Sequence, residues 1–266
     1  MFASLEKYYG LFRIRAKGIT VYKGDFVVTL LLRVLFPVLM IFVWTAVYVT
    51  TGTTKIAGFS LLGIYAYFLI TASLAPFRSD IDDMIGSDVL TGAIAVFLVR
   101  PITYLLDSII TDLSTVVVGF FTLTVPILAL AVLFVPLNAS LLLFGLFGVE
   151  AIAAYLISML LEIMVGLLAV YFTSYAGMAA VINRCMSFFG GGLLPLSFFP
   201  SQISTVLSYL PFQFLYYVPA ATLSGSISVQ SSLFSLAIAA IWIVGLFVAA
   251  KFAWRAAKKH INAVGV

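Results

Sequence analysis

The chain has 266 residues, of which 64% are hydrophobic and only 9% are charged, whereas an average soluble domain carries about 25% charged residues. Ten acidic and fourteen basic side chains are too few to cover the surface of a soluble protein of this length. The composition therefore excludes a soluble enzyme, a nucleic-acid-binding protein and a disordered chain, and it predicts an integral membrane protein.

Six apolar stretches of the chain are candidates for membrane-spanning helices, which need about 20 residues each. They cover residues 26–49, 59–77, 105–135, 141–172, 177–198 and 233–254. Continuous apolar runs favour helices over the alternating pattern of a barrel. We therefore predict an all-α membrane protein that forms a single transmembrane domain over residues 1–266, with six transmembrane helices.

The basic residues indicate the orientation. Nine of the fourteen lie near the two ends, namely Lys7, Arg13, Arg15, Lys17, Lys23, Lys251, Arg255, Lys258 and Lys259. The segments that would then lie outside contain only Lys55. Because cytoplasmic segments are enriched in Lys and Arg, we expect both termini in the cytoplasm of a multi-pass protein in a prokaryotic cell membrane.

Residues 1–24 alternate large apolar side chains with basic ones, which is typical of an amphipathic helix lying on membrane lipid. A loose basic tail on anionic lipid is the alternative.

The chain has only one histidine and one cysteine, His260 and Cys185, which argues against a transition-metal site and against an intramembrane enzyme. We expect no metal and no cofactor on this chain.

The cytoplasmic loop 78–104 is acidic and has helical periodicity. Its acids and apolar residues include Asp80, Ile81, Asp82, Asp83, Met84, Ile85 and Asp88. This pattern predicts an amphipathic helix over residues 80–91 that ends at Gly92. Such a helix suits docking into a groove of a cytoplasmic partner, and a solvated connector is the alternative. The acids are not spaced like a calcium-binding loop.

The external segment 195–225 has no charged residue, four prolines and seven aromatic residues. It is too apolar for an open loop and too interrupted for a full span. A re-entrant or interfacial helix pair over about residues 199–230 fits best, because such backbone is tolerated where protein buries it. We expect an outer gate, with an aromatic anchor at the lipid head groups as the alternative.

Ionisable residues inside the spans are candidates for function. Glu150 and Glu162 lie in the fourth span and Arg184 in the fifth. If these spans form a hairpin that turns near Thr173, Glu162 and Arg184 lie at similar depth, and we expect them to pair. Glu150 has no obvious partner, so it would line the pathway or be protonated and hydrogen-bonded. A proton-coupled secondary transporter with Glu150 or Glu162 as relay is therefore one alternative function.

Two motifs carry a family resemblance. The stretch from Gly92 to Arg100 and Pro101 resembles the pattern after the second helix of type-2 ATP-binding-cassette (ABC) exporter permeases. The outer segment, with Pro195, Pro200, Pro211, Phe212, Pro219 and Gly225, is similar to the external segment before the last helix of the same family. Span number, orientation and the N-terminal helix agree with the compact six-helix branch.

This resemblance implies two permease subunits, identical or paralogous, around a pathway above two cytoplasmic ATPases that bind ATP and Mg. The loop from Asp80 to Pro101 would couple to the ATPases, and the outer segment would cap the pathway. No G-x-x-x-x-G-K-[ST] phosphate loop occurs in this chain, so we expect a transport subunit that is not itself an enzyme.

The run of three glycines, Gly190, Gly191 and Gly192, predicts a close helix contact or a kink. A weakly charged, aromatic pathway would suit an amphipathic or lipid-like substrate.

Overall fold

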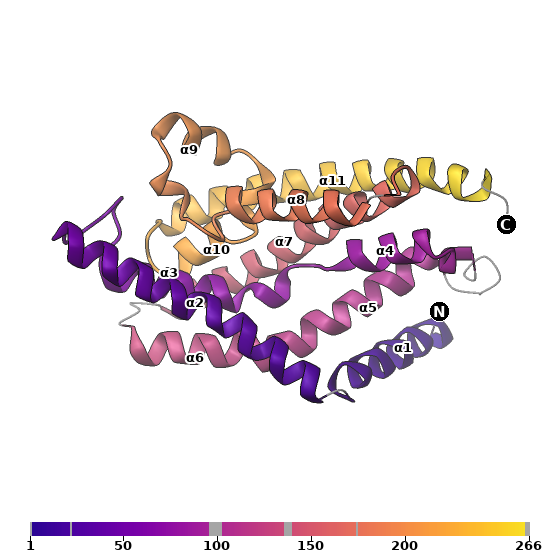
Figure 1. Cartoon of the computed structure of the whole chain (residues 1–266), viewed down its shortest axis with the longest axis horizontal. Coiled ribbons are helices and arrows are strands. Elements are labelled where there is room, and N and C mark those ends of the chain that lie inside the picture. Colours follow the sequence, from indigo (N-terminus) through magenta and orange to yellow (C-terminus); the bar gives the residue numbers. More distant parts are fainter. Residues whose placement is uncertain (1, 22, 96–102, 136–139, 174, 264–266) are drawn as a thin grey trace.

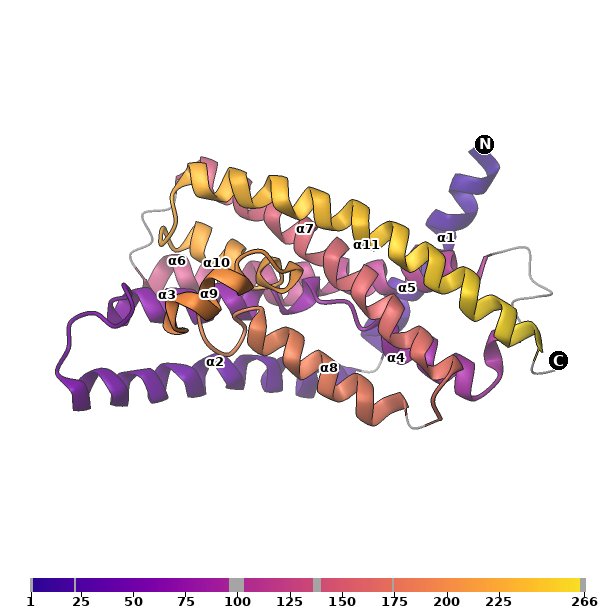
Figure 2. The ribbon, with the colours of Figure 1, turned by 90° about the horizontal axis from the view of Figure 1, so that it is seen from above.

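The structure is a computed structural model that describes residues 2–21, 23–95, 103–135, 140–173 and 175–263. It is an elongated bundle of helices, and both chain ends lie toward the end of the bundle that carries helix α4 (Figures 1 and 2). The long helices run roughly along the bundle, and the short helices of residues 196–223 lie toward the other end (Figure 1).

The first half of the chain contains the helices α1 (Phe2–Val21), α2 (Lys23–Thr51), α3 (Leu61–Ser73), η1 (Ala75–Phe77), α4 (Ile81–Leu90), α5 (Tyr104–Gly119), η3 (Phe120–Thr124) and α6 (Val125–Phe134). The second half contains α7 (Leu141–Gly166), η4 (Leu167–Val170), α8 (Tyr175–Phe189), η5 (Leu196–Phe198), α9 (Ser201–Leu207), η6 (Pro211–Phe214), α10 (Tyr217–Leu223) and α11 (Val229–Ala263).

Four of the six predicted spans are long apolar helices in the described part of the chain. They include Val34–Thr51 of α2, Tyr104–Phe134, Leu141–Val170 and Val229–Ile261. The second and fifth predicted spans form shorter helices, because α3 has 13 residues and α8 has 15. Helix α3 is followed by the η1 turn with Pro76, and α8 ends before the three glycines. The all-helical membrane fold is confirmed, and the number of six spans stays a prediction.

Helix α7 is the central element of the bundle. Within the apolar window of Leu141–Val170, 72% of the residues are buried, against 28% for Tyr104–Phe134 and 17% for Val229–Ile261. Helix α7 packs against α11, α4 and α10. Helices α2 and α11 instead expose many large apolar side chains, which is expected for helices whose outer surface meets lipid or another subunit.

The third predicted span contains a π-helical turn. Elements α5, η3 and α6 are contiguous along the chain, and the N–H of Val125 donates to the carbonyl oxygen of Phe120. Pro126 follows at once, and a proline inside a helix removes one N–H donor and its ring clashes with the preceding turn. The wider turn relieves this clash. The Thr124 hydroxyl donates to the Ser73 carbonyl at 2.6 Å, which ties this turn to the end of α3.

The three consecutive glycines form a close contact between α8 and the outer segment, as predicted. A Cβ on Gly190 would lie 2.7 Å from the Phe212 carbonyl oxygen, and a Cβ on Gly191 would lie 2.8 Å from the Tyr217 Cβ. Gly191 also has a φ of +89°, which other residues rarely adopt. Its carbonyl oxygen accepts a hydrogen bond from the Tyr67 hydroxyl at 2.6 Å.

The predicted residues of the outer cap lie at the ends of its short helices or within them. Their positions are Pro195 before η5, Pro200 before α9, Pro211 and Phe212 in η6, Pro219 in the first turn of α10, and Gly225 with φ +72° after α10. Helix α10 is buried against α7 and α3. Buried backbone of this kind is what a re-entrant segment requires, and its re-entry into the membrane stays a prediction.

We expect Gly191→Ala to lower the thermal stability of the purified protein much more than Gly58→Ala. Both glycines have a positive φ, but nothing lies within 4 Å of a Cβ on Gly58. Gly58→Ala therefore adds only backbone strain of about 1–2 kcal/mol, whereas Gly191→Ala adds overpacking of about 1–3 kcal/mol. Melting curves in detergent measure the difference, and equal curves would contradict the close contact.

Candidate functional site

The helix predicted over residues 80–91 is observed as helix α4, over Ile81–Leu90, and its cytoplasmic location stays a prediction. Asp80 precedes its first turn, and Asp82 and Asp83 lie within that turn, where carboxylates interact favourably with the helix dipole. Gly92 has a φ of +74° and ends the helix, as its position in the sequence predicted. Helix α4 lies at the end of the bundle that also holds both termini (Figure 1).

The apolar face of α4 packs on its own bundle. Ile81 and Ile85 are fully buried, and α4 contacts α7 and η4. Two glycines permit this close approach. A Cβ on Gly166 would lie 2.9 Å from the Asp82 Cα, and a Cβ on Gly86 would lie 2.2 Å from the Tyr175 ring. The apolar face of α4 is therefore not open to a partner, because α7 and η4 already cover it, and docking of the helix into a partner stays a prediction.

Asp82 is buried in the bundle although it is an acidic residue of the connecting segment between two spans. It is 1% exposed, and its Oδ2 accepts hydrogen bonds from the Tyr175 hydroxyl at 3.2 Å and from the Asn183 Nδ2 at 3.0 Å. Both donors belong to α8. A buried carboxylate requires such partners because desolvation of an unpaired charge is costly. Asp82 therefore fixes α4 to α8 and does not face solvent.

Two other acids lie on the exposed side of α4 and its flanking residues, which comprises Asp80, Asp83, Ser87, Leu90 and Thr91. We call this set the acidic face. Partial burial, together with the like charges of Asp82 and Asp80, raises the pKa of Asp83 above its ordinary value. Asp88 is half-buried and accepts a hydrogen bond from the Tyr104 hydroxyl at 2.9 Å. Met84 is also half-buried, so it borders the acidic face.

Asp112 holds the chain just before α4. Its two carboxylate oxygens accept hydrogen bonds from the Ser79 hydroxyl at 2.9 Å and from the Asp80 backbone N–H at 3.3 Å. The backbone N–H of Ser79 in turn donates to the Ser158 hydroxyl at 3.0 Å. The entry into α4 is thus bound both to α5, through Asp112, and to α7, through Ser158.

The buried Glu162 pairs with Arg78 and not with Arg184. The distance from Glu162 Oε1 to Arg78 Nη2 is 3.4 Å, and Glu162 is 1% exposed. The Arg184 side chain is exposed, and the ion pairs found among the described residues do not include it. The predicted pair of Glu162 and Arg184 is therefore wrong. The α7–α8 hairpin does turn near Thr173, but Arg184 is exposed whereas Glu162 is buried.

Glu150 is buried near the opposite end of α7 and is hydrogen-bonded. Its Oε1 accepts bonds from the Thr222 hydroxyl at 2.8 Å and from the Ser232 hydroxyl at 2.6 Å. These donors belong to α10 and α11, so Glu150 joins the central helix to the outer cap and to the last span. Of the two roles expected for Glu150, the structure favours the hydrogen-bonded one. Its second oxygen, Oε2, has no hydrogen-bond partner within the described residues.

Helix α1 is bound to the same end of the bundle as α4. It packs along α5, and Arg15 Nη2 lies 3.2 Å from Oδ2 of Asp107, which is 6% exposed. Arg13, Arg15 and Lys17 are exposed. A helix with this basic surface suits an interface with anionic lipid, and its position on the membrane stays a prediction.

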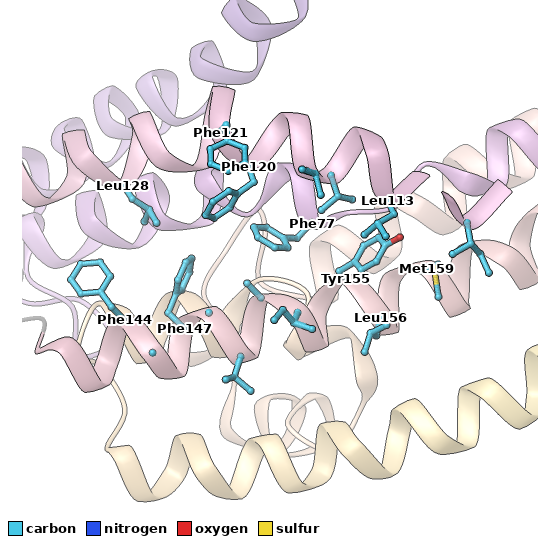
Figure 3. Close-up of a pocket in the computed structure, with 18 residues that line it drawn as sticks. Phe77, Leu113, Phe120, Phe121, Leu128, Phe144, Phe147, Tyr155, Leu156 and Met159 are labelled. Carbon is cyan, nitrogen blue, oxygen red and sulfur yellow. The ribbon is translucent and has the colours of Figure 1, made fainter. Parts of the chain in front are cut away.

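A groove with an apolar lining lies between α5–η3–α6 and α7 (Figure 3). Its volume is about 950 Å³. Phe120 and Phe121 of the π-helical turn line it from one side and Phe144 and Phe147 of α7 from the other. The Phe77 and Phe120 rings lie edge to face, with centroids 6.2 Å apart. The groove is open at its side, and an apolar surface of this kind at membrane depth suits a hydrocarbon chain.

Two predicted residues, Arg100 and Pro101, lie outside the described residues. Among those that are described, no group of three or more His, Cys, Asp or Glu side chains is arranged to hold a metal ion. Cys185 is exposed and unpaired. The site therefore consists of α4, its buried anchors on α5, α7 and α8, and the acidic face.

Several of these anchors could not be recognised in the sequence. Tyr175 and Asn183 lie 93 and 101 residues from Asp82 along the chain, and Ser158 lies 79 residues from Ser79. Hydroxyl and amide side chains are common in membrane helices, so no local pattern marks their partners. In the sequence, Arg78 is one basic residue of the loop 78–104, and nothing near it indicates its pairing with Glu162.

Comparison with known protein families assigns the chain to a transporter family. The model of a family described as ABC-2 family transporter protein matches residues 34–265. This match covers most of the chain, so the protein belongs to the ABC-2 transporter family, and it is the membrane subunit of an ABC transporter. A search of curated proteins found no match. The family assignment argues against the alternative of a proton-coupled secondary transporter.

We expect Arg78→Gln to destabilise the protein and Arg184→Gln to leave its stability unchanged. Loss of Arg78 leaves the buried Glu162 carboxylate without its ion-pair partner, which costs on the order of 2 kcal/mol for a pair that is only partly shielded from solvent. Arg184 is the matched control because its side chain is exposed. Thermal unfolding in detergent separates the two variants. An equal loss of stability in both would contradict the ion pair between Arg78 and Glu162.

A second pair of variants tests the contact between α4 and the end of α7. We expect Gly166→Ala to impair transport and to loosen α4, because its Cβ would collide with the backbone of Asp82. Gly145→Ala lies in the same helix with nothing within 4 Å of its Cβ, and it should preserve or raise stability. Protease accessibility of residues 78–95 is the measurement. Equal protection in the two variants would show that the contact is unimportant.

Proposed function

We propose that this protein is the membrane subunit of an ABC exporter, that it pairs with a second permease subunit, and that two cytoplasmic ATPases dock beneath the pair. The observation that carries the proposal is helix α4. Its inner face is anchored to three helices of the bundle, and its acidic face is left uncovered. A helix presented in this way suits the transfer of a conformational change between a partner and the membrane helices.

The location of α4 supports docking from the cytoplasm. The chain ends with their basic residues lie at the same end of the bundle (Figures 1 and 2). The exposed bases there include Arg13, Lys17, Arg255 and Lys258, while Lys55 lies in the connection between α2 and α3 at the other end. By the positive-inside rule the α4 end faces the cytoplasm, where ATP is available to a partner.

The acidic face predicts the chemistry of the ATPase surface. Because Ile81 and Ile85 are buried within the chain, the partner meets Asp80 and Asp83 first. A groove lined by Lys or Arg complements these carboxylates and steers the encounter. The ATPases would bind ATP and Mg. The free energy available to shift the permeases is limited by the difference between the ATP-binding free energies of the two conformations of the complex.

The apolar groove supports an amphipathic or lipid-like substrate. It lies at the level of the spans α5–η3–α6 and α7, and the side chains that line it are almost all apolar. A hydrocarbon chain entering from the bilayer would lose no hydrogen bond there. The outer cap, held to α7 by Glu150 through α10 and α11, would close the pathway on the far side.

The proposal is tested by purifying the protein in mild detergent from its native membrane. We expect an ATPase to co-purify, and ATP hydrolysis to depend on the presence of this chain. Asp83→Lys should weaken ATPase binding at least about tenfold, since like charges across an interface cost several kcal/mol and a factor of ten corresponds to about 1.4 kcal/mol.

Thr54→Lys is the matched control because Thr54 is exposed in the connection between α2 and α3. It introduces a lysine at the opposite end of the bundle and should leave the bound ATPase unchanged. A protein that transports its substrate with a proton gradient alone, with no nucleotide and no ATPase, would overturn the proposal.

A further inference from the structure

A second pocket lies at the end of the bundle away from α4, between the outer cap and the first turns of α11. Its volume is about 440 Å³, within the range of about 300–1,000 Å³ for small-molecule sites. The lining residues come from the segment after α9, from η6 and from one face of α11. This pocket is separate from the apolar groove, which lies on α5, α6 and α7.

The pocket is polar but carries no charge. Its hydrogen-bonding side chains are Ser208, Gln213, Gln230, Ser231 and Ser235. The chain contains no acidic, basic or histidine residue from position 185 to position 250. None of the residues that line the pocket is charged, so an ionic ligand would find no opposite charge among them and its desolvation would be unfavourable. Hydroxyl and amide side chains each donate and accept hydrogen bonds, so they favour a neutral ligand that does both.

Gln213 is the buried polar residue among those that line this pocket. It is 4% exposed, and its Nε2 donates to the carbonyl oxygen of Ser208. This bond fixes the orientation of the amide, since the amide oxygen could not face another oxygen. Its amide oxygen accepts no hydrogen bond in the described part of the chain, and it is available to a ligand.

Two aromatic rings complete the site. Tyr209 and Phe234 line the pocket, yet they are 61% and 65% exposed. The Trp242 indole N–H donates to the Tyr209 carbonyl at 2.8 Å, which holds the segment that carries Tyr209 against α11. Exposed rings beside fixed hydrogen-bonding groups provide flat apolar surfaces against which the C–H faces of a ligand can pack.

We propose that this pocket binds an uncharged polyhydroxyl group, either a free sugar or the sugar head group of a lipid. A sugar has the two features that the lining requires, because its hydroxyls donate and accept while its ring faces are apolar. Tyr209 and Trp242 also suit the boundary between membrane and water, where aromatic residues are enriched. This inference rests on the pocket alone and does not depend on coupling to an ATPase.

The test measures ligand binding to the full-length protein reconstituted in phosphatidylcholine nanodiscs. The probes are maltose, dodecyl maltoside and, as a control with the same alkyl chain, dodecyl octaethylene glycol. We expect saturable binding of dodecyl maltoside by native mass spectrometry, and at most weak binding of the glycol. Displacement of the maltoside by maltose would identify a free-sugar site, and binding of the maltoside alone would identify a lipid-linked sugar.

Matched variants localise the binding. We expect Gln230→Ala and Phe234→Ala to weaken maltoside binding by about 3- to 10-fold, the effect of losing one net hydrogen bond or one ring contact. Phe247→Ala is the control, because Phe247 is 59% exposed on the same helix and does not line the pocket. Both tested residues are exposed, so their replacement should leave the fold intact.

Two results would overturn the inference. The first is equal binding of the glycol and the maltoside, which would show that the sugar is not recognised. The second is unchanged maltoside binding in Gln230→Ala and Phe234→Ala, which would place any sugar elsewhere. Neither result bears on the proposed exporter function, because ATPase co-purification with α4 is measured separately.

Discussion

Two carboxylates on one buried helix determine how this bundle is assembled. Glu162 and Glu150 lie in α7, whose surroundings are otherwise apolar, and neither can be left without partners at low dielectric. Arg78 satisfies Glu162 and thereby binds the segment before α4 to the central helix. Thr222 and Ser232 donate to one oxygen of Glu150 and thereby bind α10 and α11 to α7. The two ends of the molecule are organised around the two ends of α7.

Helix α4 belongs to this assembly as firmly as a membrane helix does. Ile81 and Ile85 are enclosed by the chain itself, Asp82 is hydrogen-bonded to α8, and Gly166 permits contact at backbone distance. A partner that moves α4 must therefore move α7 with it. This arrangement makes α4 a rigid part of the bundle although it contains ten residues, which is what the proposed attachment of an ATPase requires.

The sequence was sufficient for the features that depend on local pattern. The long apolar runs became α2, α5–η3–α6, α7 and α11, and helical spacing predicted α4 together with its end at Gly92. Periodicity identifies which residues share a face, but not which neighbour covers that face, so the burial of Ile81 and Asp82 could not be predicted. The expected pair of Glu162 with Arg184 used depth alone, and depth does not specify the direction of a side chain around its helix. The shortness of α3 and α8 depends on where Pro76 and the three glycines interrupt packing.

The two carboxylates of α7 differ in the order in which their partners are synthesised. Arg78 precedes Glu162 by 84 residues and is already present when Glu162 leaves the ribosome. The partners of Glu150 follow it by 72 and 82 residues. At translation rates of about 5–20 residues per second, the Ser232 hydroxyl is synthesised about 4–16 s after Glu150. During this interval the two hydrogen bonds that hold Glu150 to α10 and α11 cannot form, so the attachment of these helices to α7 is completed only when the last helix is made.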